Sequence, residues 1–248
     1  MPDGRPGDGF LGGRLRLIQP PRGAHRAGTD AVLLARLLAI APGQHVCDAG
    51  AGTGAVGLAC ALLAPGCTVG LLERDAGTAE MARANVAENG VSDRVGVIEA
   101  DLLAPASARR AAGLMPETAD CVLTNPPFFE EGGARPSPDP LRAAAHHLPA
   151  GGLDAWLRAC TDLLRPKGRL GLIHRADALP ACLDALRNRF GDIAVRPVHP
   201  RADAAANRIL VSAVKGSRAP FRLLAPLVLH DASGAFTPEA ARMHSGEP

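Results

Sequence analysis

Apolar residues along the chain fall into short runs typical of buried strands and longer stretches typical of helices. The short runs predict strands at residues 45–49, 68–73, 94–99, 120–124 and 169–174. Helical patterns lie between them at residues 55–63, 77–89, 153–164 and 178–189, and an earlier helix is expected through Ile40, capped by Thr29 or Asp30. Strands that alternate with helices of this length predict βαβ units and a doubly wound, mostly parallel sheet.

The end of the chain breaks this alternation. Two further predicted strands, Ile193–Val198 and Ile209–Val214, are joined by a short stretch without a helix. Strands connected in this way pair antiparallel, so the parallel sheet is expected to finish in an antiparallel hairpin. Residues 129–140 and the chain from about Gly216 onward are expected to be loops. We divide the chain into a partly disordered N-terminal extension (1–27), a main domain (28–217) and a C-terminal tail (218–248).

Composition excludes several classes of protein. The 248 residues are 47% apolar, yet no apolar run approaches the 18 residues needed to span a bilayer, and the N-terminus has no segment like a signal peptide. Six cysteines without a CxxC pair predict reduced, mostly buried thiols. The histidines in or beside the strands do not cluster, so we expect no metal site. We therefore expect a cytoplasmic protein that does not contact a membrane, and we favour a monomer.

The net charge of +2 hides an uneven distribution. Residues 1–26 carry +3, residues 27–186 carry −5, and residues 187–222 carry +6. Basic ends around an acidic middle suggest a polyanion that contacts the ends, although a solvated, arginine-rich surface explains the charge equally well.

A glycine-rich turn, Asp48-Ala49-Gly50-Ala51-Gly52-Thr53-Gly54, follows one predicted strand and opens a helix. Glycines allow the backbone to turn sharply and to approach a ligand closely. Glu73, at the end of the next strand, is placed to accept hydrogen bonds from ribose hydroxyls. These features alone fit both a nicotinamide enzyme and an S-adenosylmethionine enzyme.

Two carboxylates distinguish these possibilities. Asp48 would repel a pyrophosphate but tolerate a cationic amino-acid ligand, and Asp101, after the third strand, could accept from an adenine amine. The pattern resembles the class I S-adenosylmethionine-dependent methyltransferases, which have a Rossmann-like, seven-stranded sheet with an antiparallel last strand. The resemblance implies that the cofactor is S-adenosyl-L-methionine, bound by Asp48, Gly50, Gly52, Gly54, Glu73 and Asp101.

The tetrapeptide Asn125-Pro126-Pro127-Phe128 ends the fourth predicted strand. The side-chain carbonyl of Asn125 and the backbone carbonyl of Pro126 can each accept one N–H of a conjugated amine, which frees the nitrogen lone pair for methylation. The two prolines stiffen the loop, and Phe128 would stack on a planar base. In methyltransferases with this tetrapeptide, the pattern marks methylation of an amino group on adenine, on guanine or on protein glutamine.

The N-terminal part of the chain narrows the choice among these substrates. Residues 10–20 and 28–34 closely resemble the start of the bacterial tRNA1(Val) adenine-N6 methyltransferase family, which modifies the adenine 3′ of the anticodon. The resemblance implies a tRNA substrate, and it implies that Thr29 and Asp30 lie near the methionine end of the cofactor. The alternatives are a protein-glutamine N5 or rRNA guanine-N2 methyltransferase, and a non-catalytic RNA-binding protein with this fold.

The remaining candidates are single residues. Arg14, Arg16, Arg208 and Lys215 are the candidates for contact with nucleic acid, and simple solvent exposure would account for Arg208 and Lys215 equally well. His146 and His147 follow the tetrapeptide and are more typical of solvated loop residues than of a base pocket. Trp156, at helical spacing from neighbouring leucines, is expected in the core.

Overall fold

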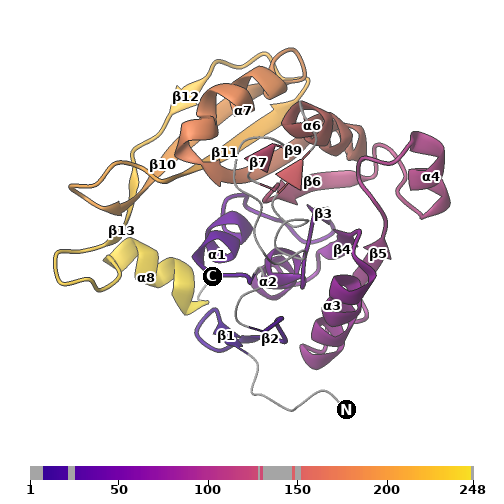
Figure 1. The fold of residues 1–248 in the computed structure, drawn as a ribbon, viewed down its shortest axis with the longest axis horizontal. Helices are drawn as coiled ribbons and strands as arrows, with labels where there is room; N and C mark the ends of the chain where they lie inside the picture. The colour runs from indigo at the N-terminus through magenta and orange to yellow at the C-terminus, as the bar shows by residue number, and fades with distance from the viewer. Residues whose placement is uncertain (1–7, 22–25, 128, 131–146, 149–151, 247–248) are drawn as a thin grey trace.

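A computed structural model describes residues 8–21, 26–127, 129–130, 147–148 and 152–246 of the chain. Its centre is a sheet of nine strands with helices on both faces (Figure 1). The strands, in sheet order, are β5 (Val95–Glu99), β4 (Thr68–Glu73), β3 (His45–Ala49), β6 (Ala119–Thr124), β9 (Leu164–Arg175), β11 (Arg208–Lys215), β10 (Phe190–Arg201) and β12 (Arg222–Leu223), and β13 (Leu227–His230) also pairs with β10.

The sheet confirms the predicted fold class. Strands β5, β4, β3, β6 and β9 are parallel, and β11 runs antiparallel to both β9 and β10. These seven strands are the predicted set, and β12 and β13 extend the sheet beyond β10. The predicted bounds of β3, β4 and α2 are reproduced residue for residue, whereas β9 and β10 are longer than expected.

Two hydrophobic cores fill the space between the sheet and its helices. The helices are α1 (Thr29–Ala35), α2 (Ala55–Leu63), α3 (Ala76–Glu88), α4 (Ala106–Ala111), α6 (Gly152–Leu163), α7 (Leu179–Leu186) and α8 (Pro238–Ser245), with a 3-10 turn at Ala176–Ala178. Helices α1, α2 and α3 pack on one face, and α6 and α7 on the other (Figure 1). Successive residues of a strand enter different cores, as Cys121 and Val122 do, because strand side chains alternate between faces.

The first helix differs from its prediction at both ends. Gly28 is the N-cap and makes no side-chain hydrogen bond, so neither Thr29 nor Asp30 caps the helix. The helix ends at Ala35 rather than Ile40, because the amide of Leu37 donates to the carbonyl of Leu34 in a tighter turn.

The chain after Gly216 is folded, and the expectation of a loop there is wrong. Strands β12 and β13 add to β10, and α8 packs against α1. Thr237 caps α8 by accepting from the amide of Ala240, and Pro238 occupies the first turn. Arg36, the residue after α1, donates to the Met243 carbonyl at 2.8 Å, so the backbone of α8 is bound at the end of α1.

A small hairpin near the N-terminus completes the face that carries α3. Strands β1 (Asp8–Phe10) and β2 (Leu15–Leu17) pair antiparallel, and the side chains of Leu15 and Leu17 are buried. All six cysteines are buried and free, as predicted. Within the described part of the chain, no helix is long and apolar enough to cross a membrane.

Two further short strands lie outside the main sheet. They are β7 (Phe129–Glu130) and β8 (His147–Leu148), and they pair parallel with each other. The loop predicted at residues 129–140 therefore begins with a strand, and its remainder, residues 131–140, lies outside the described residues.

Candidate active site

The predicted site residues follow neighbouring parallel strands at one edge of the sheet, the carboxyl edge. The chain runs from β3 to β4 and β5 on one side and returns to β6 on the other side of β3. This reversal makes the ends of β3 and β6 a topological switch point, where doubly wound sheets bind ligands. Ala49 and Thr124 are paired across these two strands, so the glycine turn and the Asn125 tetrapeptide begin side by side.

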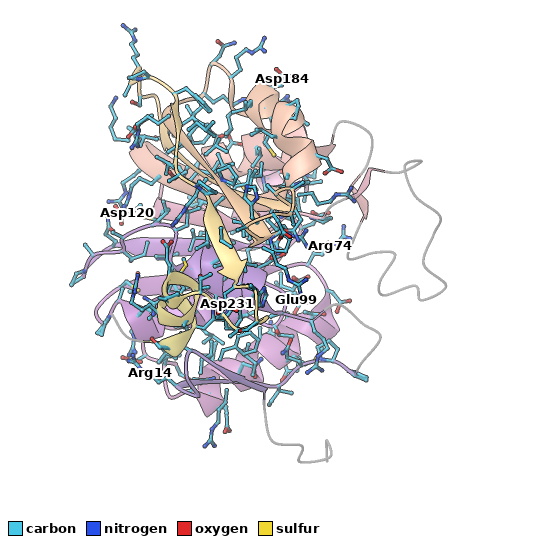
Figure 2. All side chains as sticks on the ribbon, turned by 90° about the vertical axis from the view of Figure 1, so that its left-hand side faces the viewer. Arg14, Arg74, Glu99, Asp120, Asp184 and Asp231 are labelled. Atoms are coloured by element: carbon cyan, nitrogen blue, oxygen red, sulfur yellow. The ribbon has the colours of Figure 1, made fainter. Side chains whose placement is uncertain are left out.

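Figure 2 shows how the two edges of the sheet are separated. Arg74 and Glu99, at the carboxyl ends of β4 and β5, lie on the opposite side of the molecule from Asp120, which stands near the start of β6. The edge that carries Asp120 is called the amino edge below.

The glycine turn has a backbone that needs glycine. Gly50, Gly52 and Gly54 have φ values of +75°, +56° and +89°, in the left-handed region that other residues rarely adopt. A Cβ on Gly54 would lie 2.9 Å from Leu71, whereas a Cβ on Gly52 would meet nothing within 4 Å. Gly54 is therefore needed for packing against the sheet, and Gly52 faces open space.

Three neighbours fix the shape of this turn. The Leu72 carbonyl accepts from the amides of Gly50 and Ala51. The Glu73 carboxylate accepts from the Gly52 amide at 2.9 Å. Asn85, fully buried in α3, donates to the Thr53 carbonyl at 2.9 Å and to the Ile18 carbonyl at 2.9 Å. The turn is therefore ordered by β4, by α3 and by the segment that follows the N-terminal hairpin.

Asp48 lies beneath the turn and holds the start of α2. Its side chain is buried, and Oδ2 accepts from the Gly57 amide at 2.8 Å. Gly54, the N-cap of α2, has no side chain to do this. Burial raises the pKa of Asp48 to about 7, and the nearby Glu73 carboxylate adds to this rise against the opposing effect of the Gly57 hydrogen bond. Asp48 thus supports the turn from below.

The other predicted carboxylates stand at the same edge. Glu73 ends β4, and its Oε1 accepts from the amides of Arg74 and Asp75 at 2.8 and 2.9 Å. Asp101 follows β5, is exposed, and accepts from the Leu103 amide at 2.8 Å through Oδ1. The exposed Asp101 remains the candidate acceptor for an adenine amine, and the Glu73 carboxylate, which backbone amides orient, remains the candidate for a ribose.

Asn125 has an unsatisfied acceptor. Its Oδ1 is buried and has no hydrogen-bond partner in the part of the chain that the structure describes. A buried acceptor without a partner costs about 1–3 kcal/mol, so such groups call for an explanation. Pro126 is buried and Pro127 half-buried, which holds the backbone on which Asn125 stands. An N–H donor from a ligand would satisfy this oxygen.

Thr29 and Asp30 begin α1 near the same edge, where Asp30 is paired with a residue predicted for another role. Asp30 Oδ2 lies 2.9 Å from Arg208 Nε, and both side chains are about three-quarters buried, at 26% and 29% exposure. Arg208 opens β11 opposite Arg175, the last residue of β9, which places it at the carboxyl edge. The structure therefore joins one predicted cofactor residue to one predicted RNA-binding residue.

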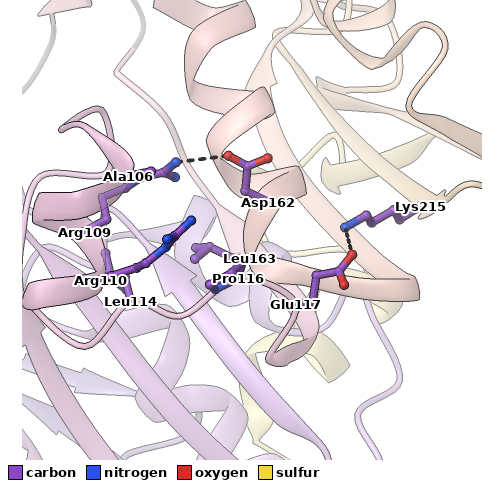
Figure 3. Close-up of a pocket in the computed structure, with 9 residues that line it drawn as sticks. All are labelled: Ala106, Arg109, Arg110, Leu114, Pro116, Glu117, Asp162, Leu163 and Lys215. Carbon is purple, nitrogen blue, oxygen red and sulfur yellow. Dashed lines mark hydrogen bonds and ion pairs between the residues drawn. The ribbon is translucent and has the colours of Figure 1, made fainter.

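Lys215 lies at the amino edge, away from the other predicted site residues. It borders a hollow of about 330 Å³ together with Arg109, Arg110, Glu117 and Asp162 (Figure 3). Lys215 contacts Glu117 at 3.1 Å, and Arg109 contacts Asp162 at 3.0 Å (Figure 3). The charges around this hollow are thus largely paired with one another.

Arg14 and Arg16 belong to the N-terminal hairpin. Arg14 donates to the Gly246 carbonyl in the last turn of the chain, and the side chain of Arg16 is exposed. Phe128 and His146 lie outside the described residues. His147 is described only through its backbone, in β8.

Three residues of the site were not predicted for it. Trp156 is buried, as expected of a core residue, but its indole N–H also donates to the Thr124 hydroxyl at 2.9 Å. Asn85 holds the glycine turn from α3. A polar residue on a buried helix face was the available signal for Asn85, whereas the contacts of Thr124 depend on strand pairing that no local pattern reveals.

S-adenosylmethionine fits these residues. The open space in front of Gly52, the Glu73 carboxylate and the exposed Asp101 supply room for a backbone-bound ligand and acceptors for its hydroxyl and amine groups. No thiol competes as a nucleophile among the described residues here, since burial raises the pKa of Cys47, in β3, to about 12.

Comparison with known proteins decides the family. A family model described as the methyltransferase small domain matches residues 25–156. The chain belongs to this family. It is therefore an S-adenosylmethionine-dependent methyltransferase, as the sequence predicted.

Relatives of this methyltransferase carry a specific name. A Porphyromonas gingivalis protein named tRNA1(Val) (adenine(37)-N6)-methyltransferase is 32% identical over 231 residues, which cover 89% of this chain and 87% of the relative. A protein of the same name from Aeromonas hydrophila is 31% identical over 226 residues and covers 89% of each chain.

Solved structures agree on the fold. A predicted O-methyltransferase, protein Atu636 from Agrobacterium tumefaciens, is 35% identical, covers 88% of this chain and 96% of its own, and has a TM-score of 0.75. TrmN from Thermus thermophilus, at 24% identity and a TM-score of 0.53, covers 75% of this chain and 47% of its own, and shows the shared fold alone.

Proposed function

We propose that this methyltransferase transfers a methyl group to N6 of an adenine in tRNA, at the position named for its relatives, adenine 37. The buried, unpartnered Oδ1 of Asn125, next to the glycine turn at the switch point, is the observation that carries the proposal within the described residues. The names of the relatives from P. gingivalis and A. hydrophila supply the tRNA and the base. As a tRNA-modifying enzyme it would act in the cytoplasm.

The residues of the site suit a poorly nucleophilic amine. The lone pair of an adenine N6 is delocalised into the ring, so the nitrogen must be drawn toward tetrahedral geometry before it reacts. Asn125 Oδ1 and the Pro126 carbonyl would each accept one N–H, and the adjoining prolines hold the two acceptors in place before the substrate arrives. Phe128 would stack on the base.

Cofactor binding rests on the turn and its neighbours. Gly50, Gly52 and Gly54 would cradle the ligand, Glu73 would accept from the ribose hydroxyls, and Asp101 from the adenine amine. Asp48 would act by holding α2 and the turn in place. When bound, S-adenosylmethionine would supply a methyl group on a positively charged sulfur. The sulfur would keep the electron pair of the broken bond, and the methylated nitrogen would release one of its two protons to solvent.

Contact with the tRNA backbone would come from arginines at the carboxyl edge. Arg208 begins β11 and Arg201 ends β10, so both stand at the edge that carries Asn125. The exposed Arg16 adds charge from the hairpin, and Arg201 is exposed as well. Arg14, Arg208 and Lys215 are held by Gly246, Asp30 and Glu117 and are weaker candidates. Phosphate contacts of this kind position an RNA without reading its sequence.

A transfer assay with nucleoside analysis tests the proposal. Purified protein is incubated with methyl-labelled S-adenosylmethionine and tRNA from cells that lack the gene, and the tRNA is then digested to nucleosides. We expect label in N6-methyladenosine. Label in a methylated guanosine, in a ribose hydroxyl or in protein would overturn the proposal, and it would instead favour the guanine, oxygen or glutamine acceptor.

A further inference from the structure

The last residue of β6, Thr124, connects the two halves of the site through its side chain. The Thr124 hydroxyl donates to the Ala49 carbonyl at 2.8 Å and accepts from the Trp156 indole N–H at 2.9 Å. Thr124 and Trp156 are 0% and 7% exposed. Ala49 directly precedes Gly50, the first glycine of the turn, and Thr124 directly precedes Asn125, so this hydroxyl links the ends of the two strands from which both functional segments depart.

The indole ring of Trp156 reaches the turn itself. A Cβ on Gly50 would lie 3.0 Å from Cζ2 and 3.2 Å from Cη2 of Trp156, so the ring lies directly against the backbone of the turn. Trp156 therefore contacts the cofactor turn with its ring and the acceptor strand with its N–H. It comes from α6, on the face of the sheet opposite α2.

The indole N–H depends on this one hydroxyl. A buried donor without a partner is costly, so loss of the Thr124 hydroxyl would leave the ring free to shift against Gly50. A shift of this kind would change the position of the turn relative to Asn125, and methyl transfer is sensitive to misplacement by about 1 Å.

We propose that Thr124 and Trp156 form a positioning pair that fixes the cofactor turn relative to the Asn125 acceptor. The proposal rests on the methyltransferase function proposed above, because it assigns the pair a role in alignment of the two reactants. The pair has a positioning role and not a catalytic one, because neither side chain supplies a group that reacts. It acts through Gly50 on one side and through the backbone before Asn125 on the other.

Trp156 is the only tryptophan of the chain, and the chain has no tyrosine, so the emission of the protein reports on the surroundings of Trp156. This measurement does not require a methyl acceptor. We expect S-adenosylmethionine to change the emission of the wild-type protein, since the ring lies on the turn that would bind it. Removal of the hydroxyl in Thr124→Val should shift the emission of the free protein and alter its response to the cofactor.

Thr161→Val is the matched control. The Thr161 hydroxyl also donates to a backbone carbonyl, that of Leu157 at 2.7 Å, and Thr161 lies on the same helix as Trp156. Both substitutions replace a threonine by valine, which has a similar shape but no hydroxyl. Only the Thr124 hydroxyl bridges the turn and the acceptor strand. Melting temperatures of both variants measure the purely structural cost.

The decisive measurements are the Kd for the cofactor by calorimetry, the kcat for methylation of tRNA and the tryptophan emission. We expect Thr124→Val to lower kcat about tenfold or more and to weaken cofactor binding severalfold, while Thr161→Val leaves both within about twofold. Trp156→Phe should resemble Thr124→Val in kcat and Kd, and the double variant should lose no more than the worse single variant, because both remove the same hydrogen bond.

Two results would overturn the positioning role. One is a Thr124→Val protein with unchanged kcat, Kd and response to the cofactor but a lowered melting temperature, which would make the hydroxyl purely structural. The other is wild-type emission that does not respond to cofactor binding detected by calorimetry. If tRNA is not methylated by the wild-type protein while Kd and emission still change in Thr124→Val, the substrate proposal fails and the positioning pair stands.

Discussion

The two edges of the central sheet leave different kinds of polar group without a partner in the described residues. At the amino edge, the hollow beside Lys215 is bordered by cations and carboxylates that are paired at 3.0 and 3.1 Å. At the carboxyl edge, Asn125 Oδ1 is buried without a partner in the described residues, and Gly52 opens onto free space. Arg109 Nε, at the hollow, is also buried without a partner in the described residues, so the first edge retains a donor N–H whereas the second retains a vacant acceptor.

The contrast shows that a hollow and a functional site are different features. A concave surface whose charges neutralise one another offers little net attraction to a ligand. An unsatisfied buried acceptor gains a full hydrogen bond when a donor arrives, because its cost has already been met by the fold. An amine substrate needs acceptors for its N–H groups and not a further donor, so we propose that methylation takes place at the carboxyl edge and not at the hollow.

The largest expected effect is at Asn125. Asn125→Ala removes the vacant acceptor, and we expect turnover to fall about 10²–10³-fold, the loss seen when one preorganised polar group is removed from an active site. Cofactor Kd by calorimetry should stay within about twofold of wild type. If the variant kept the turnover of the wild type, the vacant acceptor would not mark the carboxyl edge as the site of methylation.

The next effect concerns the carboxylate beneath the turn. Burial raises the pKa of Asp48 from 3.8 to about 7, so the folded protein binds a proton that the unfolded chain releases between these pH values. Wild-type stability should therefore fall as pH rises through this window, relative to Asp48→Asn, by up to about 4 kcal/mol.

Denaturant unfolding of both proteins at pH 4, 5.5 and 7 measures this difference. The side-chain amide that Asp48→Asn introduces keeps an oxygen that can accept from Gly57, so the comparison isolates the ionisation. A difference in stability that does not change with pH would contradict a buried, titrating Asp48.

Two glycines at the carboxyl edge should respond in different ways. Gly57→Ala places a Cβ 2.9 Å from Val69 and even closer to Leu71, so we expect a loss of about 1–3 kcal/mol in unfolding free energy and little specific effect on the cofactor. A Cβ on Gly52 meets no protein atom within 4 Å, so Gly52→Ala should weaken cofactor binding about tenfold, beyond the strain of its positive φ.

Calorimetry and thermal melting of the two variants separate these effects. If Gly57→Ala weakened the cofactor as strongly as Gly52→Ala, the open space before Gly52 would have no special role.

The smallest effect is expected at the amino edge. Lys215→Ala removes the ion pair with Glu117, whose carboxylate is more than half exposed, and the hydrogen bond to the Leu164 carbonyl at 2.6 Å, so stability should fall by about 1 kcal/mol. Methylation of tRNA should stay within about twofold of wild type. A loss comparable with that of Asn125→Ala would instead place the amino edge in the tRNA-binding surface.

Local patterns predicted the elements that make up the core of the domain. The strands β3 and β4 and the helix α2 were predicted with their observed bounds, because short apolar runs there are bounded by glycines, prolines and charges. The carboxyl-edge placement of Glu73 and Asn125 followed from the parallel order of the strands, which the βαβ pattern already indicates.

What the sequence missed depends on contacts between distant residues. The pairing of Asp30 with Arg208 joins positions 178 residues apart. Asp30 does not cap α1, because it is the second residue of the helix and Gly28 takes the N-cap position. The Thr124 bridge to Trp156 likewise requires that α6 lie over the end of β6. The folded C-terminal segment was missed because α8 is held by contacts with residues far away in the sequence, such as the ion pair of Glu239 with Arg196 at 2.7 Å and the bond from Arg36 to the Met243 carbonyl.

The contact of Arg14 with the Gly246 carbonyl joins positions 232 residues apart. Bringing together positions this far apart closes a loop that contains almost every other element of the fold. Such a closure carries a large entropic cost, so we expect this contact to form late in folding, after the local contacts of the hairpin and of α8.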